Sequence, residues 1–279
     1  MKSSLLLLNG LEKPVIDWIK IVQSNGGATP SGNTNRALSN FYAKLRSSGL
    51  NNKIKSLNAF VPDNLIAAQT PLISTVGSSI WSNTNFVTGD LTINGLKGNG
   101  SNKYLNTGIT CNSIFSTSNM GVTLYVPENS AGVGHNYGCA NDPGYTNDCV
   151  GTFWVSGAGV FMDSYNTVVT TGGRYTITQV ANWTGLLSMQ RTANNVFNAY
   201  WQKPGAAVVL AQGPYANSGG SVPTTTMYAF CSNSSTAPSF YSGDRMSILA
   251  FHDGMTAAET IQFGALIKSL RQQLGGGYV

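Results

Sequence analysis

The chain has 279 residues, of which only 10% are charged, and its formal net charge is +5. This length allows one large domain or two small ones with a substantial core. The charged fraction lies well below the roughly 25% of typical soluble domains, which indicates a neutral surface rich in Gly, Ser, Thr and Asn. The basic residues are scattered rather than gathered in runs, which argues against a nucleic-acid-binding protein.

The N-terminal apolar run, four leucines at residues 5–8, is short. A signal peptide needs about 7–15 apolar residues followed by a small-residue cleavage motif, and neither is present. No later segment approaches the roughly 20 consecutive apolar residues that span a bilayer. We therefore expect a protein made without secretory processing and without membrane insertion.

The first 82 residues have the apolar spacing of amphipathic helices. One helix is predicted over residues 13–27, where Pro14 favours a start and Gly26 an end. A second is predicted over residues 35–50, and a shorter third over residues 62–72. Because such apolar stripes usually face a core, we predict that residues 1–82 form a helical N-terminal segment.

From about Leu91 onward apolar and polar residues alternate, as in strands with one buried face. Glycine-rich turns separate the apolar runs, and no helical pattern lies between them. Residues 83–279 are therefore predicted to form a mainly β fold, an antiparallel β-sandwich of the jelly-roll type. The predicted strands are residues 91–95, 103–109, 120–126, 151–156, 159–163, 174–182, 186–192, 197–202, 207–212, 225–231 and 245–252.

The stretch "GLKGNGSNKYLNTGI" partly matches the pattern of a phosphate-binding loop. Ser101 occupies the position where that loop needs a lysine, and an extended pattern follows in place of a helix. We predict a glycine-rich turn that leads into a strand.

A helix is predicted to close the chain over residues 255–275. Thr256 and Glu259 have the spacing of a capping box, which satisfies two free amides at the first turn. Its apolar stripe is predicted to pack on the sandwich and consists of Ile261, Leu266, Ile267, Leu270 and Leu274.

Acidic pairs and metal-ligand motifs are weak in this sequence. No two carboxylates have the strand spacing that glycosidases on sandwich folds use, and no nucleophile with a histidine partner can be identified. His135, Cys139 and Cys149 match no zinc motif. Cys139 and Cys149 bracket a loop and could form a disulfide in an oxidising compartment, although reduced thiols are expected here. We predict no cofactor, no metal and no catalytic residue.

Aromatic residues give the clearest functional indication. Tyrosine and tryptophan rings combine an apolar face with a polar tip, so exposed rings can stack on sugars. In the predicted strand "FNAYWQ", alternate rings point to opposite faces, so at least one ring is expected to be exposed. The glycan-binding candidates are Trp154, Trp183, Tyr200, Trp201, Tyr215 and Tyr241.

Three stretches, "LKGNGSNKYLNTGI", "GLLSMQRTANNVFNAYWQ" and "RMSILAFHDGMTAAETIQFGALIKSLRQQLG", resemble the laminin-G/concanavalin A-like domains of many bacteriophage and other viral proteins. The resemblance implies a concanavalin A-like sandwich in a non-enzymatic virion protein, such as a capsid decoration, fibre or tail module that serves host attachment. Implied partners are cell-surface glycans, other virion subunits and copies of the same chain. The calcium-binding acids of some such domains have only Asp142 and Asp148 as candidates.

Two alternatives remain open. A polysaccharide-degrading enzyme is the first, either a glycosidase or a lyase. A lyase would use an arginine or glutamine beside a tyrosine or histidine base. Arg174, Tyr175 and Gln179 are the local candidates, without the companion histidine that such lyases carry. A cement subunit of the particle without any ligand is the second.

Overall fold

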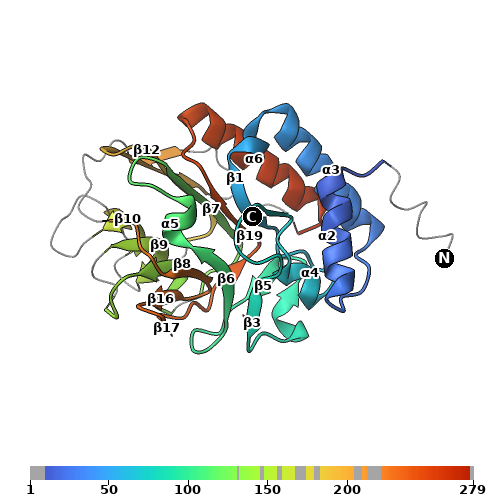
Figure 1. The fold of residues 1–279 in the computed structure, drawn as a ribbon, viewed down its shortest axis with the longest axis horizontal. Coiled ribbons are helices and arrows are strands. Elements are labelled where there is room, and N and C mark those ends of the chain that lie inside the picture. The colour runs from blue at the N-terminus through green and yellow to red at the C-terminus, as the bar shows by residue number, and fades with distance from the viewer. Residues whose placement is uncertain are drawn as a thin grey trace.

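Two β-sheets and a layer of helices are stacked in the order helices, first sheet, second sheet (Figure 1). The computed structural model describes residues 10–130, 132–144, 148–155, 159–166, 174–178, 183–203, 209–212 and 221–276. The mainly β, antiparallel sandwich with N-terminal helices and a closing helix is thus confirmed.

The first sheet has seven strands, and every pairing in it is antiparallel. β7 lies at its centre and is buried along its whole length. The order across the sheet is β14 (Val209–Gln212), β13 (Val196–Gln202), β12 (Gly185–Ala193), β7 (Met120–Val126), β19 (Ile248–His252), β1 (Ile54–Asn58) and β2 (Ile73–Ser74).

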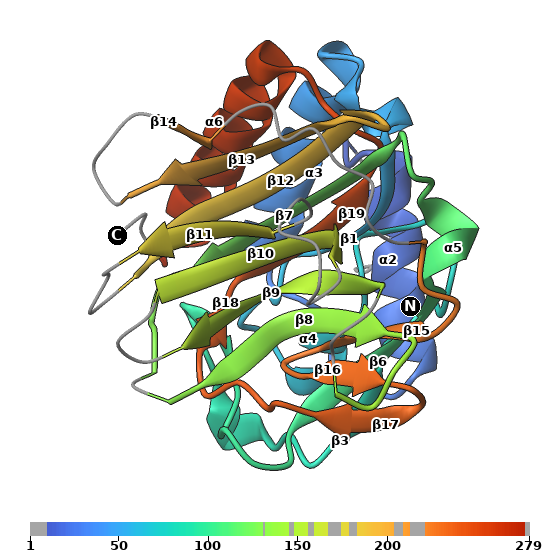
Figure 2. The same ribbon diagram turned by 90° about the vertical axis from the view of Figure 1, so that its left-hand side faces the viewer.

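The second sheet has nine strands and faces the viewer in Figure 2. Its main order is β11 (Arg174–Thr178), β10 (Gly159–Asn166), β9 (Cys149–Val155), β8 (Gly134–Ala140), β15 (Thr226–Ala229), β6 (Tyr104–Thr110) and β3 (Ser82–Thr84). The hairpin of β16 (Ser232–Ser234) and β17 (Ala237–Ser239) joins it, with β16 parallel to β8. A small third sheet contains β18 (Arg245–Met246), β5 (Gly95–Lys97) and β4 (Leu91–Thr92).

The predicted helices are all present. They are α2 (Lys13–Ser24), α3 (Gly32–Ser47), α4 (Leu65–Gln69) and α6 (Ala257–Gln273), with short turns at α5 (Cys111–Ile114), η1 (Leu50–Asn52) and η2 (Thr88–Asp90). The Ser31 hydroxyl accepts a hydrogen bond from the Thr34 amide at the start of α3. Thr256 and Glu259 form the predicted capping box of α6.

Strand alternation divides the apolar residues into two cores. On β7, Val122 and Leu124 point between the sheets, whereas Tyr125 points into the core shared with the helices. On β19, Phe251 and Ala250 divide in the same way. The first sheet is therefore covered on both faces, by the second sheet on one side and by α2, α3 and α6 on the other.

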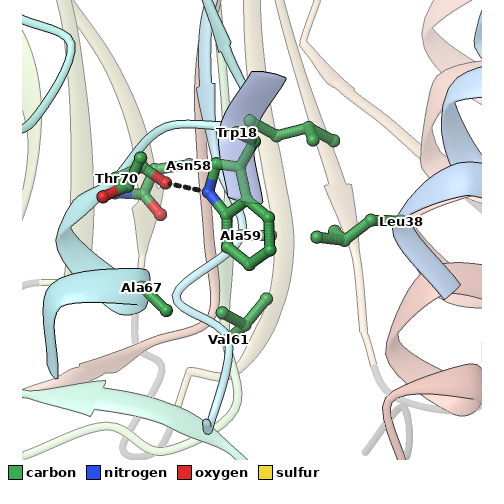
Figure 3. A pocket seen from close by; sticks show the side chains of 8 residues that line it. Trp18, Leu38, Asn58, Ala59, Val61, Ala67 and Thr70 are labelled. Carbon is green, nitrogen blue, oxygen red and sulfur yellow. Dashed lines mark hydrogen bonds between the residues drawn. The ribbon is translucent and has the colours of Figure 1, made fainter. Parts of the chain in front are cut away.

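Trp18 of α2 anchors the helical layer (Figure 3). Its indole is 2% exposed and packs among Leu38, Ala59 and Val61. The indole nitrogen donates to the Thr70 carbonyl at 2.9 Å, which satisfies its polar tip inside an apolar site.

None of the described helices has both the length and the apolar composition that a membrane-spanning helix needs.

The segment predicted as helical, residues 1–82, is helical only in part. Its strand β1 pairs with β19 inside the first sheet, and β3 crosses the predicted boundary to pair with β6. β8 was also missed. A Cβ at Gly134 would lie 2.3 Å from the Tyr241 carbonyl oxygen, so a glycine that weakens the strand signal is required there by close packing.

The turn before β6 is held by one side chain. The Asn99 amide oxygen accepts from the backbone amides of Ser101, Asn102 and Lys103 at 3.0, 3.0 and 3.2 Å. Lys103 is paired with Asp90 and is mostly buried. A turn that leads into a strand is confirmed.

A buried polar chain connects β19, β7 and β12 beneath α6. His252 Nε2 lies 2.9 Å from the Thr123 hydroxyl, which lies 2.6 Å from the Ser188 hydroxyl. Gln190 donates to Ser188 and accepts from the Met255 amide, each at 2.8 Å. Because these groups satisfy one another, the polar residues are tolerated between two apolar layers.

Because His252 is buried among these hydrogen-bonded side chains, we expect the free energy of unfolding to fall at acidic pH. Burial lowers the pKa of His252 to about 4, with the Asp253 carbonyl and carboxylate opposing the shift and Lys53 adding to it. Above pH 6.5 the imidazole is neutral in both states, and as the pH falls from 6.5 toward 4 the unfolded chain takes up the proton first. We expect the wild type to lose about 3 kcal/mol more than His252→Gln over this window.

The measurement is urea unfolding of both proteins from pH 7.5 to pH 4. The carboxylates and His135 are present in both proteins, so their contributions to the pH dependence cancel in the difference between wild type and variant. Parallel stability curves would contradict a neutral, buried His252.

Candidate functional site

The face of the second sheet that points away from the first sheet carries the candidate site, and it is seen from the front in Figure 2. Along β6, Leu105 and Ile109 point into the core between the sheets. Tyr104 and Asn106, which alternate with them, therefore point outward and are half-buried. We call this surface the outer face.

Three tyrosines gather on the outer face, and we call them the tyrosine cluster: Tyr104 on β6, Tyr228 on β15 and Tyr241 after β17. The rings of Tyr104 and Tyr228 are stacked, with centroids 5.0 Å apart and an interplanar angle of 26°. The Tyr241 ring lies 6.3 Å from Tyr104 and is tilted by 54°. All three rings are half-buried, so they form a partly accessible aromatic surface.

Two phenols of the tyrosine cluster have raised pKa values. Burial raises the pKa of Tyr228, and Tyr104 and Cys231 add to the shift. Burial also raises the pKa of Tyr241, with Cys231 and Tyr104 as further causes. The phenol groups of Tyr228 and Tyr241 consequently keep their protons at neutral pH and can both donate and accept hydrogen bonds.

Phe240 extends the aromatic surface next to Tyr241. Its ring is 43% exposed and stacks on the buried His135 imidazole, with centroids 5.1 Å apart. The Phe240 carbonyl accepts from the His135 amide at 2.8 Å. Its φ of 52° lies in the left-handed region, which is unfavourable for a bulky residue. Burial and the charge of Arg174 lower the pKa of His135 to about 3, so this imidazole is neutral.

An ion pair lies farther along the outer face. Arg174 of β11 donates from Nε and Nη2 to the two carboxylate oxygens of Asp163 at 2.7 and 2.9 Å. The guanidinium lies 5.2 Å from the Phe161 ring centroid. Burial raises the pKa of Asp163, while Arg174 opposes the shift. One register row connects this pair to the tyrosine cluster and runs Arg174, Asp163, Gly151, Gly138, Tyr228 and Asn106.

The predicted glycan-binding residues are dispersed. Tyr241 lies in the tyrosine cluster, and Trp201 is half-buried at the edge of the core between the sheets, with its indole nitrogen 3.1 Å from the Thr184 carbonyl. Trp154 is in β9, and only its backbone is described. Tyr215 lies outside the described residues.

Two candidates are corrected by the structure. Trp183 is 0% exposed in the core between the sheets, and Tyr200 is 4% exposed. The expectation of an exposed ring on "FNAYWQ" assumed that one face of its sheet meets solvent. Both faces of the first sheet are covered, so Tyr200 on β13 is enclosed even though Phe197 and Ala199 do lie on the opposite face, as predicted.

The possible zinc ligands and the disulfide pair are separated by strand alternation. Cys139 points into the core between the sheets, whereas Cys149 packs on the other side of the sheet with Ala140 and Phe161. Both thiols are free. Within the described residues, no group of three or more His, Cys, Asp or Glu side chains could hold a metal.

The lyase candidates are likewise divided. Tyr175 packs in the core between the sheets, while Arg174 on the outer face is committed to Asp163. Adjacent strand residues point to opposite faces, which accounts for the separation. Gln179 lies outside the described residues.

Tyr104, Tyr228 and Phe240 were not predicted as site residues. The alternation in "KYLNTGI" and "TTMYAFC" places each tyrosine opposite an apolar neighbour, which is a usable signal for its face. What the sequence lacks is the pairing of β6 with β15 across more than a hundred residues.

No protein-family model matches the chain, and no curated protein sequence matches it. The carbohydrate-binding CBM40 domain of Ruminococcus gnavus IT-sialidase is a similar solved structure, at 10% identity and a TM-score of 0.39, covering 59% of this chain and 95% of that one. The same domain bound to α2,3-sialyllactose aligns at 10% identity and a TM-score of 0.34, over 51% and 79%. A leech intramolecular trans-sialidase aligns at 11% identity and a TM-score of 0.38, over 57% of this chain and 26% of that enzyme.

Such distant likenesses carry no argument about ligand or reaction. The chain spans only about a quarter of the leech enzyme. The functional argument therefore rests on the residues of the outer face.

The strain at Phe240 gives a testable prediction. Phe240→Gly removes the left-handed strain, about 1–2 kcal/mol, together with a half-exposed ring, so we expect the free energy of unfolding to change by less than about 1 kcal/mol. Phe230 also has a positive φ, of 68°, but it is 0% exposed and contacts Phe60 and Phe86. Phe230→Gly is expected to cost about 3–5 kcal/mol.

Urea denaturation of the two variants and the wild type checks this pair. A large decrease in the free energy of unfolding of Phe240→Gly would mean that the ring stabilises the fold by packing and is not kept exposed for binding.

Proposed function

We propose that this chain is a non-catalytic carbohydrate-binding protein that holds a sugar ring against the tyrosine cluster. The observation that carries the proposal is the convergence of Tyr104, Tyr228 and Tyr241 on one accessible face. These residues come from segments far apart in the sequence, and a core would not need their rings on that side of the sheet. Phe240, which precedes Tyr241 in the chain, adds a ring that is 43% exposed.

The chemistry of the cluster favours a neutral sugar. A pyranose presents an apolar C–H face that packs on an aromatic ring, while its hydroxyls need neutral donors and acceptors. The phenol groups provide both, and Asn106 lies in register with Tyr228. The nearby cation Lys103 is already paired with Asp90, so it favours no additional acidic group.

Two features support a binding role over catalysis. The Asp163 carboxylate is 0% exposed and is held by both donors of the Arg174 fork, so it is poorly placed as a general acid or base. Strand alternation also separates the tyrosine and arginine that a lyase would use together.

The wider setting that we propose is a virion. The sequence resemblance to viral laminin-G/concanavalin A-like domains and the low charged fraction support a structural or attachment protein of the particle. In this setting the helical layer contacts other virion subunits or copies of the chain, and the outer face is directed toward cell-surface glycans.

Glycan binding is tested with an array of neutral and acidic oligosaccharides, followed by calorimetry on the best ligand. Tyr104→Ala and Tyr228→Ala are expected to weaken binding at least about tenfold, or about 1.4 kcal/mol, because each removes one of the two stacked rings. Tyr42→Ala, a half-buried tyrosine on α3, is the matched control and should leave binding unchanged.

An array without any bound sugar would contradict the binding role and favour a cement subunit without a ligand. If Tyr42→Ala weakened binding as much as the cluster variants do, the proposed location of the site on the outer face would be contradicted. New double bonds or shortened chains in incubated polysaccharides would favour the enzyme.

The virion setting has its own test. Mass spectrometry of purified particles is expected to detect the chain at a fixed stoichiometry to the capsid protein. Its absence from particles would contradict the setting and leave the sugar-binding site to be judged separately.

A further inference from the structure

A groove of about 300 Å³ lies between the helical layer and the edge of the first sheet, far from the tyrosine cluster. Residues of α2 and α3 line one side, and the segment around β2 lines the other. The apolar side chains that line it are Pro14, Trp18, Ile21, Tyr42, Leu72 and Ile73.

Three of the polar side chains that line this groove already have partners. The Ser74 hydroxyl donates to the Val76 carbonyl at 3.1 Å, and the Thr75 hydroxyl donates to the Lys55 carbonyl at 2.9 Å. Asp17 is paired with Lys13 and lies 3.9 Å from Lys20. With these groups satisfied, the groove offers mainly apolar surface, which an apolar occupant would bury most favourably.

The N-terminal chain arrives at this groove. The Glu12 amide donates to the Ser39 hydroxyl at 2.8 Å, and Arg46 donates to the Glu12 carboxylate at 2.8 Å. Tyr42 lies between Ser39 and Arg46 on the same side of α3 at helical spacing. The chain before α2 therefore crosses the helix surface that presents Tyr42, and Gly10, with φ of 89°, can reverse its direction.

The leucine run, residues 5–8, precedes this crossing and lies outside the described residues. We propose that the leucine run docks in the groove of its own chain. Leu5 lies five positions before Gly10 in the chain, and an extended chain of five steps reaches about 17 Å. This tether also favours docking in the same chain over docking in a second copy, since a short linker gives an effective concentration of roughly millimolar.

Cross-linking tests the proposal on the full chain. Leu7→Cys is combined with Ser79→Cys, which places a thiol at the exposed rim of the groove. All four native cysteines are buried, so they do not compete. Mild oxidation is expected to give a disulfide within the monomer, since a bond requires the two Cα atoms to approach within about 7 Å.

A matched pair and a sequence variant make the result specific. Leu7→Cys with Asn195→Cys, an exposed position in the turn between β12 and β13, should give no disulfide within the monomer. Replacing Leu5, Leu6 and Leu8 by serine in the Leu7–Ser79 pair should lower the cross-linking yield at least about fivefold, because a tail without apolar side chains gains little from the groove.

Each other outcome overturns the proposal. Disulfide-linked dimers would assign the groove to a second copy of the chain. An unchanged cross-linking yield in the serine variant would mean that the disulfide forms by random collision of the tail with the groove. The absence of any cross-link would mean that the leucine run does not reach the groove. Because the groove lies apart from the tyrosine cluster, none of these results bears on sugar binding.

Discussion

The architecture depends on the burial of the first sheet on both of its faces. β7 and β19 divide their side chains between the core facing the second sheet and the core facing the helices. Apolar burial contributes roughly 25 cal/mol per Å², so a strand with two buried faces is a large source of stability. It also leaves little room for polar side chains unless they satisfy one another, as His252, Thr123 and Ser188 do.

This arrangement determines where the protein can meet a ligand. The first sheet has no face left for solvent, and the helical layer uses its apolar stripe to cover that sheet. The outer face of the second sheet is the remaining broad β surface, and the half-exposed rings of Tyr104, Tyr228 and Tyr241 are found there. Enclosure of one sheet thus leaves the outer face of the other as the place for the proposed binding site.

Local sequence patterns predicted most elements of the fold. The position and the capping box of α6 were predicted correctly, because Thr256 and Glu259 act within one helical turn. Its apolar stripe was predicted only in part, since Ile261 is 50% exposed and Phe263 is buried in its place. β8 was missed because "GHNYGCA" combines two glycines, a histidine and an asparagine, whose strand propensity is low. At Gly138 a Cβ would lie 3.2 Å from the Ser232 hydroxyl and 3.3 Å from His135 Nδ1, so tertiary packing sets the residue there.

The candidate site was harder to predict than the fold, since it depends on which face of each strand is covered. Alternation correctly separates Tyr200 from Phe197 and Ala199, but alternation cannot show that the far side of β13, where Tyr200 is 4% exposed, is also enclosed. Only Tyr241 among the six candidates lies in the tyrosine cluster, and its neighbours come from strands that pair across long stretches of chain. The local sequence around each of these tyrosines does not indicate which strands will pair and bring the rings together.

The backbone around the β16–β17 hairpin adds a reason to regard the outer face as functional. Phe230, Ser235, Thr236 and Phe240 all have positive φ, a conformation that costs non-glycine residues about 1 kcal/mol or more each. Phe230 recovers this cost through burial at 0% exposure, whereas Phe240 leaves 43% of its surface in solvent. Folding stability therefore gives little preference for phenylalanine over glycine at position 240. Part of the cost is offset in the folded protein by the stack of the Phe240 ring on the His135 imidazole, and in the proposed function the exposed part of the ring, which precedes Tyr241 in the chain, is the surface that a bound sugar would cover.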